Sequence, residues 1–177
     1  MKSFLSAVLV GALLVGCGKP EVAVDGSAHI QGSGVTFDGK SLTLKRDTLP
    51  AATIGMDGTL SIGGKPVALN DAQRQAMRGY YAQVQAVANK GIDIGTQGAA
   101  FGAHAAGEAL KGVLSGNVEK MGDKIQADGE AFKQNALRIC DQLSKLRTAQ
   151  DAAVQLVPAF APYSTLTQHD VDDCRKE

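Results

Sequence analysis

The chain has 177 residues, and its 18 Lys and Arg residues balance 18 Asp and Glu residues, so the formal net charge is zero. This balance excludes the basic footprint that nucleic-acid binding requires. A hydrophobic content of 44% excludes a disordered chain and fits one globular domain. Aromatic residues make up only 5%, so the core must depend on small-residue packing or on a covalent link.

The N-terminus has the pattern of a bacterial lipoprotein signal. Lys2 supplies a positive charge, and residues 4–14 form an uncharged, mostly apolar run that is too short to span a membrane. The run leads into the sequence LVGC at residues 14–17, which resembles a lipobox. In a lipobox, small residues precede the cysteine whose thiol takes the diacylglycerol, so we expect lipidation of Cys17.

Cleavage before Cys17 divides the N-terminal region into two parts. We expect a signal peptide at residues 1–16, and the lipidated Cys17 with a tether at residues 17–27. Lipid on Cys17 would attach the protein to a membrane without a transmembrane helix. Gly18 follows the cysteine, which favours the outer membrane, with the protein facing the periplasm.

Residues 28–69 have the composition of a small antiparallel β-meander. Short alternating or β-branched runs predict strands at 35–37, 41–45, 59–62 and 65–69. The dipeptides Asp38-Gly39, Asp57-Gly58 and Gly63-Gly64 separate these runs, and such pairs favour hairpin turns because they tolerate positive φ. Pro50 and Pro66 are expected at sheet edges or strand starts.

At Asn70 the hydrophobic period changes from 2 to 3.6, and residues 70–177 are expected to be helical. Asn70 and Gln73 resemble a capping box. The expected inner face of the first helix runs through Met77, Tyr81, Val84, Ala88, Gly91, Gly95, Gly98, Gly102, Ala106, Ala109 and Val113. Glycine costs about 1 kcal/mol relative to Ala in a helix, so this helix should kink or fray unless tertiary packing holds it.

A turn at residues 115–117 and a second amphipathic segment ending before Pro158 predict an antiparallel helical hairpin. A short C-terminal helix should follow toward Cys174, which makes the fold class α+β. The helix-packing residues Gly91, Gly95, Gly98 and Gly102 are expected to let the second helix approach closely. The same spacing also occurs in transmembrane helix pairs, but charged residues interrupt the segment and disfavour insertion.

The cysteine count predicts a disulfide. With Cys17 acylated, Cys140 and Cys174 are the remaining pair, and two cysteines in an oxidising periplasm are expected to join. The bond would hold the C-terminal tail against the second helix. Neither residue lies in a Cys-x-x-Cys motif, which disfavours a redox-active pair.

Motifs of catalysis and metal binding are incomplete in this sequence. His104 and Glu108 lie one helical turn apart, but two ligands do not make a zinc site. The acidic residues at 170–173 lack the Gly and the distant Glu of a calcium loop. Ser33 lacks the preceding Gly of a nucleophile elbow. We therefore expect no catalytic residue, no metal, no cofactor and no enzymatic activity.

The segment at residues 56–74 resembles the YggN-like family of uncharacterised proteobacterial envelope proteins. The similarity is carried by a hairpin-to-helix transition, with Gly64, Val67, Leu69, Asn70, Ala72, Gln73 and Arg74 at the family's positions. The resemblance implies long helices after the hairpin and a cysteine late in the second helix, which Cys140 matches. It also implies an envelope location, and the family supplies no catalytic residue.

These observations favour a lipid-anchored, non-enzymatic protein that binds another envelope protein. A first alternative is a periplasmic enzyme accessory or inhibitor lipoprotein that uses an edge of the β-meander as its binding strand. A second is a metal-dependent hydrolase that uses His104 and Glu108. The sequence leaves the partner, the oligomeric state and the physiological process open.

Overall fold

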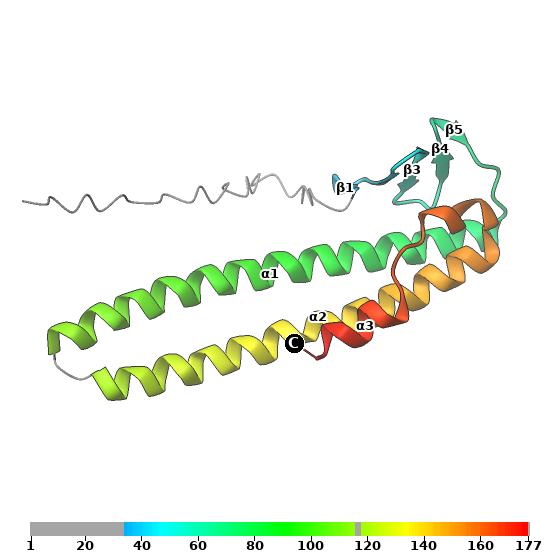
Figure 1. The fold of residues 1–177 in the computed structure, drawn as a ribbon. Coiled ribbons are helices and arrows are strands. Elements are labelled where there is room, and N and C mark those ends of the chain that lie inside the picture. Colours follow the sequence, from blue (N-terminus) through cyan, green and yellow to red (C-terminus); the bar gives the residue numbers. More distant parts are fainter. Residues whose placement is uncertain (1–33, 116–117, 177) are drawn as a thin grey trace, which may run out of the picture.

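The computed structural model describes residues 34–115 and 118–176. The expected signal peptide, Cys17 and the tether lie outside this range. A five-stranded antiparallel sheet precedes two long helices and a short C-terminal helix (Figure 1). The α+β fold class predicted from the sequence is confirmed.

The sheet is a meander in which each strand pairs with the next along the chain, in the order β1-β2-β3-β4-β5. Its strands are β1 (Val35–Phe37), β2 (Ser41–Arg46), β3 (Leu49–Gly55), β4 (Leu60–Ile62) and β5 (Lys65–Pro66). The central strand, β3, was not predicted from the sequence. The last strand was predicted at 65–69, but the observed strand stops at Pro66.

The turns of the sheet explain why four strands were predicted from the sequence and β3 was not. Gly39, Gly58, Gly63 and Gly64 all adopt positive φ, as the three glycine dipeptides predicted. The turn between β2 and β3 contains no glycine, because Asp47 takes the left-handed conformation there (φ 22°). Without a glycine signal, and with Pro50 near its start, β3 did not show the pattern of a strand.

The helical hairpin consists of α1 (Asp71–Ser115, 45 residues) and α2 (Val118–Leu156, 39 residues). The predicted capping box is present: Gln73 N donates to Asn70 Oδ1, and Asn70 N donates to Gln73 Oε1, both at 2.9 Å. Gln73 Nε2 also donates to the carbonyl oxygen of Leu156 at 2.9 Å, so the start of α1 is bonded to the end of α2. Despite its glycines, α1 is assigned as one continuous helix.

Two short elements complete the chain. A 3-10 helix, η1 (Pro158–Tyr163), follows α2, and α3 (Gln168–Cys174) lies alongside α2 (Figure 1). The 3-10 helix η1 was not predicted from the sequence. The short helix α3 was predicted, and its N-cap Thr167 forms a capping box with Asp170.

The hydrophobic core lies between one face of the sheet and the end of the hairpin where α1 begins and α2 ends (Figure 1). The strands contribute Phe37, Leu42, Leu44, Ala52, Ile54 and Leu60, and the helical elements contribute Met77, Tyr80, Tyr81, Val84, Ala153, Val157, Phe160 and Tyr163. We call this part of the molecule the base. The distal half is the rest of the hairpin, residues 90–115 of α1 and 118–139 of α2.

Candidate functional site

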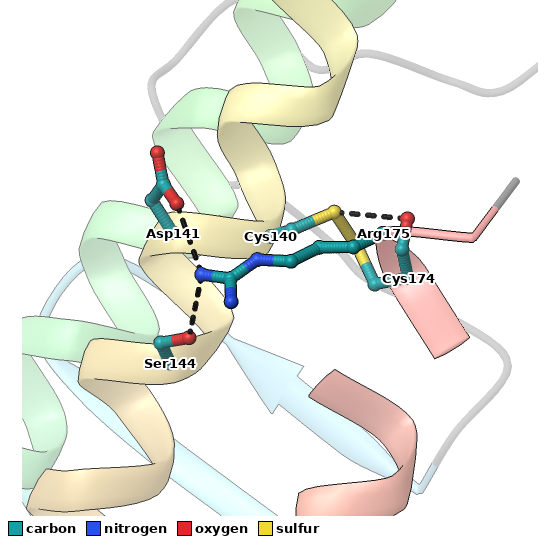
Figure 2. Close-up of a disulfide and its surroundings, with 5 residues drawn as sticks. All are labelled: Cys140, Asp141, Ser144, Cys174 and Arg175. Carbon is teal, nitrogen blue, oxygen red and sulfur yellow. Dashed lines mark hydrogen bonds and ion pairs between the residues drawn. A yellow bond between two sulfur atoms is a disulfide. The ribbon is translucent and has the colours of Figure 1, made fainter. Parts of the chain in front are cut away.

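The disulfide joins Cys140 of α2 to Cys174 at the end of α3 (Figure 2). The predicted pairing is therefore present. Cys140 is 1% exposed, and its Sγ lies 3.1 Å from the carbonyl oxygen of Cys174. Because the loop it closes spans 34 residues, the bond removes substantial entropy from the unfolded chain.

A group of polar side chains lies to one side of the disulfide (Figure 2). Arg175 Nη2 donates to Asp141 Oδ1 at 3.2 Å and to Ser144 Oγ at 3.3 Å, which ties the residue after Cys174 to the α2 surface. A surface hollow of about 370 Å³ lies beside this contact and includes Arg138 and Gln134 in its lining. Its two arginines and one aspartate are exposed and give no arrangement typical of catalysis.

A buried glutamine, a capping box and a buried valine order the tail that leads to Cys174. The buried Gln150 side chain bonds the backbone of Leu166 in both directions, accepting from its N–H at 3.2 Å and donating to its carbonyl at 2.8 Å. Hydrogen bonds from the side chain and backbone of Thr167 lower the pKa of Asp170 below its usual value. Val171 of α3 is 1% exposed. The tail is thus packed as well as covalently attached.

The glycine face of α1 differs from the expectation. A Cβ built at Gly91, Gly95 or Gly102 would meet no atom within 4 Å. These three glycines therefore do not pack under α2, and that part of the prediction was wrong. Only Gly98 of the four has a neighbour, the Phe132 ring at 3.3 Å from the position of a Cβ. The half-buried positions of this stretch include Ile94, Gly98, Phe101 and Ala105. Of these, Gly98 and Phe101 contact Phe132 of α2.

A pair of phenylalanines forms the apolar contact in the middle of the distal half. The rings of Phe101 and Phe132 are stacked, with centroids 5.9 Å apart and an angle of 4° between their planes. Each ring lies against a glycine of the opposite helix: Phe132 against Gly98, and Phe101 against Gly129, where a Cβ would be 3.6 Å from the ring. These glycines therefore provide space for the rings.

Polar side chains also form cross-helix contacts in the distal half. Asn135 accepts a hydrogen bond from Lys90 Nζ at 3.2 Å and donates to Gln97. Nearer the turn, Glu108 Oε2 lies 3.6 Å from Lys124 Nζ. The hydrogen bond and charge of Lys111, together with the charge of Lys124, lower the pKa of Glu108. Such exposed pairs contribute little each to stability.

His104 lies between two carboxylates, but their arrangement does not suit a metal. Its Nε2 is 4.0 Å from Glu108 Oε1, and its Nδ1 is 3.7 Å from Asp128 Oδ2. The carboxylates approach opposite nitrogens of the ring, so one ion could not bind all three groups. Among the described residues, no group of three or more His, Cys, Asp and Glu side chains could hold a metal. A cross-helix ion pair, formed when His104 is protonated, fits this geometry.

Comparison with known protein families shows the family of this chain. The family described as "Protein of unknown function (DUF2884)" matches residues 31–127, which include all five strands, α1 and the start of α2. The chain belongs to the DUF2884 family. No curated protein and no solved structure matches it.

The DUF2884 match ends within α2, before the disulfide and the tail that Cys174 holds. No helix in the described part of the chain is long and apolar enough to cross a membrane.

The reciprocal contacts of Phe101 with Gly129 and of Phe132 with Gly98 were not predicted from the sequence. A usable signal was present, because Phe101 and Phe132 are the only aromatic residues between Tyr81 and Phe160.

Proposed function

We propose that this DUF2884 protein is a lipid-anchored cell-envelope protein and acts as a non-enzymatic binding module. The observation that carries the proposal is the disulfide. Once Cys140 and Cys174 are joined, Cys17 is the one cysteine left in the sequence, and it ends the LVGC motif. A structural disulfide also fits an oxidising compartment such as the periplasm.

The shape of the hairpin supports the binding role. Its distal half extends well beyond the sheet and core (Figure 1). An arm of this kind presents two helix surfaces to other molecules while the base keeps the fold intact. The resemblance of residues 56–74 to the YggN-like envelope proteins supports the same location. On the basis of these residues, we propose that the chain is related to that group.

Acyl labelling of Cys17→Ser tests the anchor. We expect the variant to lose the label and to remain as uncleaved precursor, because no other cysteine follows a lipobox. Cys174→Ser is the matched control and should keep its label, since it replaces a cysteine outside the motif. A label that persists in Cys17→Ser, or disappears in the control, contradicts lipidation at this position.

The open edge of β1 favours a second candidate, an accessory or inhibitor lipoprotein that binds an enzyme through this strand. Among the described residues, β1 pairs only with β2, so its other edge could accept a strand from a partner. At the opposite edge, Pro66 lacks the N–H that such pairing needs.

Cross-linking of the detergent-solubilised protein to its envelope partner separates the two candidates. Photoreactive residues at Thr36 of β1 and at Ala131 of distal α2 mark the two surfaces; both positions are exposed. Adducts from Ala131 with a non-enzymatic partner support the binding module. Adducts from Thr36 with an enzyme support the accessory or inhibitor, and cross-linking at neither site contradicts both.

A further inference from the structure

The outer face of α1 in the distal half is exposed and uncharged. We define it by Ile92, Ala99, Ala103, Ala106, Leu110 and Leu114, all of which are exposed. From Ile92 to Leu114 the face runs about 33 Å at about 1.5 Å per residue. It points away from α2, because Gly98 and Phe101, which contact Phe132 of α2, lie on the other side of the helix.

The corresponding part of α2 is different. Between residues 122 and 139 its exposed positions include Asp123, Lys124, Glu130, Lys133 and Arg138, and α2 exposes no large hydrophobic side chain there. On the outer face of α1, by contrast, Ile92 is 45% exposed, Leu110 64% and Leu114 80%. One side of the distal half is therefore suited to water, and the other lacks the charged groups that a solvated helix normally presents.

Two oppositely charged residues lie beside the outer face, and each could pair with the other residue type in a second copy related by a two-fold axis. Asp93 and Lys111 are both exposed and lie 18 residues apart, which is five helical turns, so they share one flank of the face. In an antiparallel pair of α1 helices centred near Gly102, Asp93 of each copy would lie opposite Lys111 of the other. A two-fold axis at nearly the same position also places Ile92 of each copy opposite Leu110 of the other.

We propose that the outer face of α1 is a dimerisation surface that binds a second copy of this chain in antiparallel orientation. The two hairpins then form a four-helix arrangement with both α1 helices at its centre. Ala99 and Ala103 lie near the two-fold axis, where small side chains let helix backbones approach closely. Ile92 and Leu110 fill the contact toward its ends. Such an interface is isologous, as expected for a closed dimer.

The composition of the face favours a second copy over a lipid surface. Helices that lie on membranes combine large apolar side chains with a polar face rich in Lys and Arg. Here the middle of the face consists of Ala99, Ala103 and Ala106, and the flanking pair Asp93 and Lys111 has no net charge. A face of this kind gains little from insertion among lipids but packs well against an identical helix.

Sedimentation equilibrium of the full chain in mild detergent tests the dimer. Ala99→Glu should raise its dissociation constant at least about tenfold, because it places carboxylates in the middle of a packed contact. Ala131→Glu is the matched control: it makes the same exchange at an exposed position of α2 and should leave the constant unchanged. Equal unfolding curves for the two variants would show that the monomer is intact.

A charge exchange tests the antiparallel register. Asp93→Lys and Lys111→Asp should each weaken association by about two- to fivefold, since each creates like-charged pairs at the rim. Lys111 also contacts Glu108 at 3.2 Å within its own chain, so Asp93→Lys is the cleaner single change. The double variant should return to within about twofold of the original constant, because its pairs are again opposite in charge.

Three outcomes would overturn the proposal. The first is a monomer at every concentration up to about 100 μM, the range in which a contact of this size should associate. The second is a dimer that Ala99→Glu does not weaken. The third is a double charge exchange that fails to restore association. In the first case the outer face would be left to a lipid surface or to another protein, and none of these outcomes bears on lipidation of Cys17.

Discussion

The base and the distal half are built from the same two helices but are held together differently. In the base, buried side chains of the sheet, both helices and η1 form one cluster. In the distal half, the stacked pair of Phe101 and Phe132 and several exposed polar pairs join the helices. The comparison shows that a long helix can continue well past its core. Because the buried apolar cluster lies in the base, we expect most of the folding free energy to come from there.

The largest expected difference between the regions concerns two phenylalanines. Phe160 of η1 is fully buried and contacts Tyr80, with ring centroids 4.9 Å apart. Phe160→Ala should lower the free energy of unfolding by about 3–5 kcal/mol, the usual cost of a large cavity. Phe132→Ala, its matched change in the distal half, should cost about 1–2 kcal/mol because the ring is partly exposed.

Urea denaturation followed by circular dichroism measures both changes. Equal losses for the two variants would mean that the distal half contributes as much packing as the base. A small loss for Phe160→Ala would mean that η1 can leave the sheet without unfolding the rest.

Removing the disulfide should weaken the base from the C-terminal side. We expect the Cys140→Ser, Cys174→Ser double variant to lose about 3–4 kcal/mol, as estimated for the entropy of a 34-residue loop. Limited proteolysis with mass spectrometry should then show cleavage near Thr165, while the distal half keeps its original sites. Reduction of the unmodified protein is the control and should give the same new cleavage. Unchanged proteolysis would show that Gln150 and Arg175 hold the tail without the bond.

Alkaline pH should act on the base through Tyr80. Burial raises the pKa of Tyr80 to about 12, from 10. Because the folded state holds the phenolic proton more tightly, this contribution is present below pH 10 and is lost as the pH rises toward 12. The loss amounts to about 2–3 kcal/mol. Stability measured from pH 9 to 12 should fall less steeply in Tyr80→Phe, and a slope equal to that of the unmodified protein would contradict this role.

Substitutions at two glycines of α1 should change stability the least, and the two changes should have opposite signs. Gly98 lies under the Phe132 ring, so Gly98→Leu should overpack the contact and cost about 1–3 kcal/mol. Gly95, three residues away, has open space around it, so Gly95→Ala should raise the free energy of unfolding by up to about 1 kcal/mol. Thermal melts would show shifts of opposite sign. Shifts of the same sign would place the two glycines in equivalent surroundings.

Local signals predicted most of the element types. Alternating runs marked four of the five strands, glycine dipeptides marked three turns, and the capping residues of α1 were readable. The central strand β3 was missed, because Asp47 makes its turn without glycine and Pro50 stands near its start. Strands of this kind owe their structure to partners on both sides rather than to their own sequence.

The sequence by itself determined the α+β class, three of the four turns of the sheet and the cysteine pair that forms the disulfide, because these depend on residues close in the chain or on cysteine number. Only the tertiary structure decided which side of α1 faces α2. Apolar periodicity continued through Gly91, Gly95 and Gly102, but small residues carry too weak a hydrophobic signal to fix the rotation of a helix. The stacked rings of Phe101 and Phe132 and the polar pairs set that rotation, and they leave those three glycines without a neighbour from α2.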